Sequence, residues 1–124
     1  MNAEDKAFRG DFRRALRIPD EIVEDVLGFV ATGPTEVWSR PALTRRERSM
    51  ITIGILTALR ANDELRGHMV IALENSGLTR DEVCEVVLHC AMYAGFPAAL
   101  NGFGVASDLF SKLDRPSAAP KKDE

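Results

Sequence analysis

This sequence of 124 residues lacks the segments that would tie it to a membrane or to nucleic acid. No uninterrupted apolar run is long enough to cross a bilayer. The N-terminus, MNAEDKAFRGDFRR, is charged and contains no apolar core of a signal peptide. A net charge of -3 gives no general attraction to nucleic acid or to an anionic membrane. We therefore expect a cytoplasmic protein with neither nucleic acid nor membrane as a partner.

Lysines, cysteines and glycine-rich loops are also scarce, which argues against several cofactor chemistries. No central lysine could form a Schiff base or anchor pyridoxal phosphate, and no GxGxxG or phosphate loop occurs. Cys84 and Cys90 lie six apart in a helical pattern, roughly 9 Å along the axis and on different faces. Without CxxC or zinc-finger spacing, we interpret them as free buried thiols. The lysines are Lys6, Lys112, Lys121 and Lys122.

What is present predicts an all-α fold. A share of 45% hydrophobic and 28% charged residues is ordinary for a soluble domain. Apolar residues recur at helical spacing, and no strand pattern competes. We expect one helical domain over residues 1–113 and a disordered tail over residues 114–124, which carry two prolines and a charged end. The five or six expected helices cover about 5–17 (a short helix or an arm), 19–33, 45–60, 63–75, 79–94 and 97–113.

Local signals set the ends of these helices. Capping boxes begin at Thr44 and at Thr79, each with a glutamate three residues later. Asn62 and Asp63 can cap the helix over 63–75, and Gly77 can end it in the left-handed conformation. The remaining boundary signals are Pro19 at a helix start, Gly33-Pro34 at a helix end followed by a connector over 35–41, and Gly95 with Pro97 between the last two helices.

The helix over 45–60 is apolar almost all round, and such a helix is normally buried on every side. A chain this short has limited core to bury it. We therefore expect a partner subunit to cover part of it, which makes the protein a homo-oligomer.

Four motifs in the central part of the chain resemble the carboxymuconolactone decarboxylase family. Their order and spacing match the family from Trp38 to about Ala106, which is over half of the chain. The motifs are W-x-R-P-x-L-x-R-R-x-R-S from Trp38, E-L-x-x-H from Glu64, A-L-x-N-x-G-x-T-x-x-E from Ala72 and Y-A-G-x-P-A-A from Tyr93.

The resemblance implies an alkylhydroperoxidase-like helical fold, a homotrimer or homohexamer, and no cofactor or metal. It also implies loss of carbon dioxide from 4-carboxymuconolactone or a related butenolide carboxylate, in the β-ketoadipate pathway of aromatic-compound catabolism. The family's peroxidase branch carries a CxxC motif and then a histidine, with three residues between the second cysteine and the histidine. Here His68 matches, but Ala61 and Glu64 occupy the cysteine positions. Thiolate chemistry needs the sulfur, so the resemblance is to the decarboxylases.

Glu64 and His68 are the first candidate catalytic pair, because residues four apart share a helix face. A carboxylate beside an imidazole can orient it and raise its pKa, which would make His68 a general acid near neutrality. The alternative is a surface ion pair. The family motif favours the catalytic role.

Arginines cluster where they oppose a helix dipole, at the start of the helix over 45–60. Such a broken local rule is typical of functional sites, and guanidinium groups bind carboxylates bidentately. Arg48 fits the family motif best and is the expected catalytic arginine; Arg45 is the next candidate, for substrate binding. The alternative is solvation or pairing with the acidic stretch 20–25. The cluster comprises Arg40, Arg45, Arg46 and Arg48.

Glu85 and His89 repeat the carboxylate–imidazole spacing on the following helix. Two such pairs on adjacent helices could hold a metal, although the resemblance implies none. A structural or interface histidine is the other interpretation of His89, and a place in the substrate pocket is the third. Trp38 and Tyr93 are further candidates for binding substrate, though aromatic residues on helices are more often core.

Two other functions stay open from the sequence. One is a non-catalytic oligomeric binding protein on the same scaffold. The other is a decarboxylase, isomerase or hydrolase that acts on a related lactone in a biosynthetic pathway.

Overall fold

The computed structural model describes residues 17–116, and the regular elements of this part are all helices. Among the described helices, none combines the length and hydropathy needed to cross a membrane. The expected helix or arm over 5–17 lies almost wholly outside the described residues, as does the tail from residue 117. The helices are α2 (Val23–Thr32), α3 (Pro34–Trp38), α4 (Arg45–Leu59), α5 (Asn62–Asn75), α6 (Arg80–Tyr93) and α7 (Phe96–Asp114).

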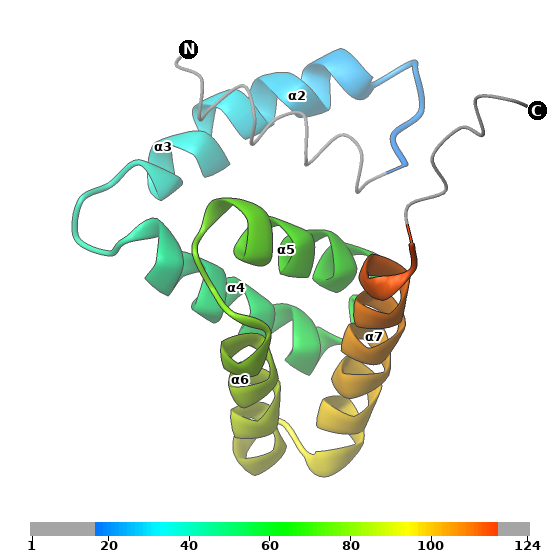
Figure 1. Cartoon of the computed structure of the whole chain (residues 1–124). Helices are drawn as coiled ribbons and strands as arrows, with labels where there is room; N and C mark the ends of the chain where they lie inside the picture. Colours follow the sequence, from blue (N-terminus) through cyan, green and yellow to red (C-terminus); the bar gives the residue numbers. More distant parts are fainter. Residues whose placement is uncertain (1–16, 117–124) are drawn as a thin grey trace, which may run out of the picture.

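Helices α4 to α7 pack around one core, and α2 with α3 lies along one side of them (Figure 1). Helix α4 is central, since it contacts α5, α6 and α7. Helices α6 and α7 form an antiparallel pair that extends from the side opposite α2 and α3. Apolar side chains from all four helices fill the core; they include Ile53, Leu65, Met69, Ala72, Val83, Val87, Ala99, Ala106 and Leu109.

The predicted capping boxes are confirmed at both positions. The Thr44 and Thr79 hydroxyls each accept a hydrogen bond from the backbone N–H three residues later, and the glutamate there accepts one from the threonine N–H. Gly77 has φ of +74°, the left-handed conformation expected where α5 ends. Helix α7 begins with Pro97 in its first turn and extends to Asp114, which pairs with Arg80.

Three boundaries differ from the sequence prediction. Helix α2 begins at Val23, after a turn in which the Ile22 N–H donates to the Pro19 carbonyl. The connector over 35–41 is partly helical, because Pro34 ends the pattern of α2 and also opens α3 as its first residue. The N-cap of α5 is Ala61, with no side-chain cap, so the capping roles predicted for Asn62 and Asp63 were wrong. Asn62 instead exchanges amide hydrogen bonds with Asn101 of α7.

Helix α4 is buried on only one face within a single copy of the chain, so the expected cover by a partner subunit stays a prediction. Only Ser49, Ile53 and Thr57 of α4 are fully buried, one turn apart on the face toward the core. A second stripe, Ile51, Ile55 and Leu59, is about half exposed or more.

Candidate active site

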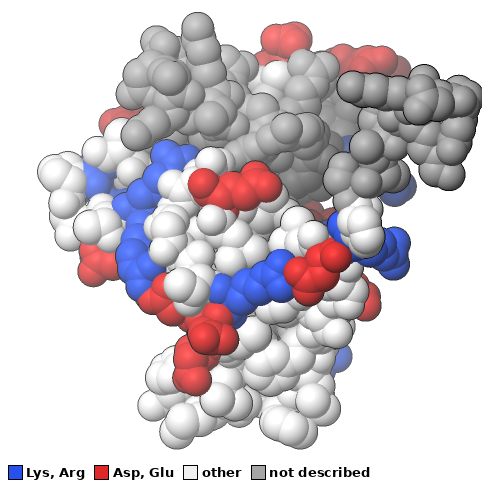
Figure 2. Space-filling model, viewed as in Figure 1, with Lys and Arg blue, Asp and Glu red and all other residues white. Residues whose placement is uncertain are grey.

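The N-terminus of α4 positions the arginine cluster. Thr44 fixes the first turn through its capping box, so Arg45 and Arg48 project three residues apart on one face of the helix. Basic side chains gather over α3 and its connection to α4 (Figure 2). Helix dipoles disfavour cations here, and a bound anion would offset that cost.

Arg46 is not part of this group, because its side chain contacts the α5–α6 connection and α6. Its Nη1 donates to the Gly77 carbonyl at 2.8 Å, and its Nη2 pairs with Glu82 of α6. Arg46 therefore joins α4 to the α5–α6 connection, which is a structural role.

Trp38, at the C-terminus of α3, brings together a cation and an imidazole. The guanidinium carbon of Arg45 lies 5.8 Å from the centroid of the Trp38 ring. The His68 ring of α5 is stacked against the same indole, with centroids 6.5 Å apart and 23° between planes. Three residues predicted separately from the sequence therefore meet in one place.

Arg48 lies one helical turn beyond Arg45. Its Nη2 donates to the carbonyl of Arg40 at 3.2 Å, in the α3–α4 connection. Its Nε is buried and has no hydrogen-bond partner among the described residues. A buried guanidinium nitrogen without a partner is costly, and an oxygen of a bound carboxylate would remove that cost.

The balance of burial and charge at His68 differs from the sequence expectation. Burial lowers the pKa of His68 from its ordinary 6.5, and the nearby charge of Glu64 raises it by less. The expected net increase in pKa was therefore wrong in direction, because spacing on a helix reveals the carboxylate but not the loss of water around the ring. At neutral pH the free protein holds His68 as the neutral imidazole.

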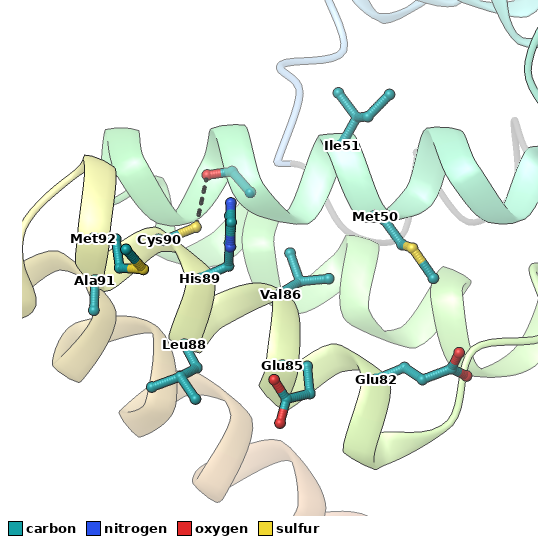
Figure 3. A pocket seen from close by; sticks show the side chains of 11 residues that line it. Met50, Ile51, Glu82, Glu85, Val86, Leu88, His89, Cys90, Ala91 and Met92 are labelled. Atoms are coloured by element: carbon teal, nitrogen blue, oxygen red, sulfur yellow. Dashed lines mark hydrogen bonds between the residues drawn. The ribbon is translucent and has the colours of Figure 1, made fainter.

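His89 and Tyr93 lie elsewhere, on α6. Their rings contact each other with centroids 5.3 Å apart and 42° between planes, and Tyr93 is 80% exposed. His89 lies in a groove between α4 and α6 with a cavity volume of about 920 Å³ (Figure 3). We call this the α4–α6 groove; Met50, Ile51, Gly54, Glu82, Glu85, Val86, Leu88, His89, Cys90, Ala91 and Met92 line it. The structure therefore does not bring His89 or Tyr93 to the Trp38–His68 contact.

The sequence raised the possibility that the pairs Glu64–His68 and Glu85–His89 together hold a metal ion. Across residues 17–116, no group of three or more histidine, cysteine, aspartate or glutamate side chains is placed to hold a metal ion. The two carboxylate–imidazole pairs belong to different surroundings, so they do not combine into the helix-bundle site considered from the sequence.

The two cysteines have the properties of unreactive thiols. Both are free, and burial raises the pKa of each above its ordinary value. The Cys90 thiol donates to the Gly54 carbonyl at 3.6 Å across the groove. A raised pKa reduces the thiolate fraction that nucleophilic chemistry requires.

The sequence of this chain is similar to those of known decarboxylases. The sequence profile of the carboxymuconolactone decarboxylase family matches residues 26–108. The chain belongs to this family. It is 47% identical over 110 residues to the 4-carboxymuconolactone decarboxylase of Acinetobacter baylyi, covering 88% of this chain and 79% of that protein.

The chain is also similar to the nitrosuccinic acid decarboxylase of Metarhizium robertsii. The two sequences are 42% identical over 77 residues, which is 62% of this chain and 53% of the relative. Both relatives are thus named as decarboxylases of carboxylic acids, although their substrates differ.

The groove residues are the part of the surface that the sequence prediction missed as a group. Two of them, Met50 and Ile51, belong to the apolar pattern of the helix expected over 45–60. From the sequence we expect a partner subunit to cover part of this helix, but the sequence does not identify the neighbouring face of α6.

Proposed function

We propose that this protein is a cofactor-independent carboxy-lyase acting on 4-carboxymuconolactone or a closely related butenolide carboxylate. The observation that carries the proposal is the contact of Trp38 with both Arg45 and His68, which places a carboxylate-binding cation and a titratable group at one site. The high identity to a named 4-carboxymuconolactone decarboxylase supports the substrate class.

The chemistry requires little of the protein. The bond between the ring carbon and its carboxyl carbon breaks, carbon dioxide leaves, and the electron pair moves into the conjugated lactone to give an oxyfuran-type enolate. A proton then adds at the carbon alpha to the lactone carbonyl, which yields the 3-oxoadipate enol-lactone type of product. The lactone is its own electron sink, so the protein need only position the substrate, stabilise the enolate oxygen and supply one proton.

The described residues suit two of these tasks, positioning the substrate and supplying the proton. Arg45 and Arg48 hold the carboxylate of the side arm, and the flat indole of Trp38 forms an apolar wall beside the ring. His68 delivers the proton, with Glu64 favouring its charged form. Because His68 is neutral in the free protein, it would gain its proton as the anionic substrate binds, since a nearby negative charge raises the pKa of an imidazole.

The test is incubation of the purified protein with 4-carboxymuconolactone, following the loss of substrate absorbance and the release of carbon dioxide. Nitrosuccinic acid serves as the second substrate, since a relative is named for it. Turnover of the lactone supports the proposal. If only nitrosuccinic acid is turned over, the substrate is that of the second relative and the lactone proposal fails. Binding of the lactone without turnover would favour a non-catalytic binding protein. Conversion without release of carbon dioxide would indicate an isomerase or hydrolase.

We further propose a cytoplasmic homotrimer or homohexamer. The support is the resemblance to a family of small helical subunits, together with the exposed apolar stripe on α4. Light scattering at micromolar concentration tests the assembly, and a monodisperse monomer would contradict it.

A further inference from the structure

A group of polar contacts ties the start of α4 to the connection between α5 and α6. The Ser49 hydroxyl donates to the Ser76 hydroxyl at 2.6 Å, and both serines are buried. Arg46 donates to the Gly77 carbonyl at 2.8 Å and pairs with Glu82. Figure 1 shows the connection leaving α5 beside the start of α4. We call these contacts the α4 clasp; it comprises Arg46 and Ser49 of α4, Ser76 and Gly77 of the connection, and Glu82 of α6.

The α4 clasp lies next to the proposed ligands of the substrate carboxylate. Arg46 directly follows Arg45 in the chain, and Ser49 directly follows Arg48, so clasp and ligands occupy adjoining faces of one helix. On the other side of the clasp, Ser76 is the C-cap of α5, the helix that carries the proposed proton donor. The clasp therefore connects the helix of the carboxylate ligands with the helix of the proton donor.

The distance between these two groups is sensitive to the tilt of α4. At its other end, α4 is joined to α5 through Arg60 and Ala61. Helix α4 has 15 residues, so it is about 22 Å long. A tilt of about 3° about that joint would move the start of a helix of this length by about 1 Å. A displacement of about 1 Å at a substrate-positioning group can lower a rate by as much as about 100-fold.

We infer that Arg46 and Ser49 are positioning residues for the proposed decarboxylation, which hold the carboxylate-binding arginines of α4 at a fixed distance from His68. The structural contacts of Arg46 thus also serve the site. The kinetic consequence rests on the proposed function, whereas the geometry that the inference assigns can be measured without turnover.

Stability alone does not account for the composition of the α4 clasp. A hydrogen bond between two buried neutral hydroxyls contributes little net stability, and an apolar pair of the same shape can be as stable. Arg46 adds a further cation to a helix start that disfavours cations. Hydrogen bonds do, however, fix the distance between donor and acceptor within narrow limits. Both contacts fix the same connection to the same part of α4, as a positioning role requires.

Arg80 provides a matched control for Arg46. The two side chains are equally exposed, at 42%. Arg80 also makes two polar contacts, one with each carboxylate oxygen of Asp114. This pair joins the start of α6 to the end of α7 and lies outside the α4 clasp. Loss of either arginine should therefore destabilise the fold to a similar extent, but only the loss of Arg46 should alter the site.

The first experiment measures steady-state kinetics on 4-carboxymuconolactone. Arg46→Gln should raise KM about tenfold and change kcat less than about threefold, because displaced arginines mainly lose substrate binding. Arg46→Lys keeps a charge beside Glu82 but lacks the planar fork that also reaches Gly77, so its KM should be intermediate. Arg80→Gln should keep KM within about twofold of wild type.

The second experiment follows the indole N–H signal of Trp38 by nuclear magnetic resonance and needs no substrate. Trp38 is the only tryptophan of the chain, so the signal is unambiguous. Its ring contacts both Arg45 and His68, and the signal therefore reports their placement. Arg46→Gln should shift the signal, and Arg80→Gln should leave it as in wild type.

A serine variant keeps the test decisive if Arg46→Gln does not fold. Ser49→Ala with Ser76→Ala removes both hydroxyls and leaves neither unpaired, so this double variant should fold. It should raise KM and shift the Trp38 signal in the same direction as Arg46→Gln.

Two outcomes would overturn the inference. One is a wild-type KM together with a wild-type Trp38 signal in Arg46→Gln, or in the serine variant if Arg46→Gln is unfolded. The other is an equal effect of Arg46→Gln and Arg80→Gln, which would indicate general destabilisation. Failure of the wild type to turn over the lactone would refute the proposed function, and the Trp38 signal would then decide the inference by itself.

Discussion

The imidazole of His68 is stacked on the indole of Trp38, with ring centroids 6.5 Å apart and planes 23° from parallel. The indole excludes water from one side of the imidazole, which contributes to the burial that lowers the pKa of His68. Because Arg45 lies over the same indole, Trp38 touches both the proposed carboxylate ligand and the proposed proton donor. Helix α3, which is only five residues long, therefore has a direct influence on the candidate site.

Substitutions at the two carboxylate–imidazole pairs should have unequal effects on decarboxylation. His68→Gln should lower kcat by on the order of 10²–10⁴, the usual contribution of a general acid, since the amide cannot titrate near neutrality. Glu64→Gln should have a smaller effect. It removes the negative charge that favours protonated His68, but glutamine keeps the shape of the glutamate side chain. His89→Gln is the matched control and should cost far less, since His89 lies in the α4–α6 groove.

Steady-state kinetics on the three variants tests this ranking, with circular dichroism to establish that each is folded. Near-wild-type turnover by His68→Gln together with an inactive Glu64→Gln would assign proton delivery to the carboxylate. Full activity of all three variants would show that the catalytic site does not include Glu64 and His68 of α5.

Trp38→Leu should raise the pKa of His68 toward its ordinary value, because water regains access to the ring. The limb of the kcat/KM profile that depends on His68 should move to higher pH. Trp38→Phe keeps an aromatic ring and should move it less. Nuclear magnetic resonance can follow the His68 ring protons directly during titration. If Trp38→Leu lowers kcat but leaves the titration of His68 unchanged, then Trp38 contributes only to substrate binding.

These relationships show which parts of the site the sequence could predict. Residues on one helix, such as Glu64 and His68, are fixed relative to each other by helical geometry, so their pairing is readable from spacing. The family motif marks Trp38 and the arginines as a set. The sequence could not reveal that Arg46 turns away to Glu82, because that depends on how α6 packs on α4. Nor could it show that burial outweighs Glu64 at His68, since burial is a property of the tertiary structure.

In the fold, too, local features were predictable from the sequence and features that depend on packing were not. Capping boxes at Thr44 and Thr79 are local, and their helices begin where predicted. The missed N-cap at Ala61 has a tertiary cause, because Asn62 is engaged by Asn101 of α7. The sequence shows that α4 is apolar almost all round, but only packing decides which face is covered within one copy.

The free energy of unfolding should depend on pH through His68. The folded-state pKa of His68 lies below 6.5, so the unfolded chain binds more protons in the interval between the folded and unfolded values. Stability should therefore fall as the pH drops from 7 through 6.5 toward the folded-state pKa. The carboxylates of Glu47 and Asp114 have lowered pKa values from 4.5 and 3.8, so their contributions are lost only at more acidic pH.

Urea denaturation at pH 7 and pH 5.5, at one protein concentration, measures this slope. His68→Gln cannot titrate and should show a smaller loss of stability between the two pH values than wild type. Equal losses in the two proteins would mean that His68 has the same pKa in the folded and unfolded chains.

The thiols should be dispensable for turnover. Cys84→Ala with Cys90→Ala should retain the wild-type rate, because burial raises the pKa of both thiols and so lowers the fraction of thiolate. A modest loss of stability, about 1 kcal/mol, is expected where Cys90 packs against Gly54. An inactive double variant with native circular dichroism would instead indicate a thiol mechanism.

Two glycines of α7 should respond to alanine in opposite directions. A Cβ at Gly102 would lie 3.0 Å from the Thr57 Cγ2 of α4 and 3.0 Å from the Val87 Cγ1 of α6, so these two fully buried side chains would have to shift to admit it. Gly102→Ala should therefore destabilise the fold by about 1–3 kcal/mol, the usual cost of overpacking. Gly104 is the matched control two residues along the same helix, where a Cβ meets nothing within 4 Å.

Gly104→Ala should stabilise the protein by up to about 1 kcal/mol, because alanine loses less conformational entropy in a helix than glycine does. Thermal and urea denaturation of the two variants beside wild type measures both effects. Since the substitutions are chemically identical and lie on one helix, helix propensity contributes equally to each, and the difference between them isolates the packing of α7 against α4 and α6. Equal stabilisation by both alanines would show that Thr57 and Val87 leave room for a Cβ at Gly102.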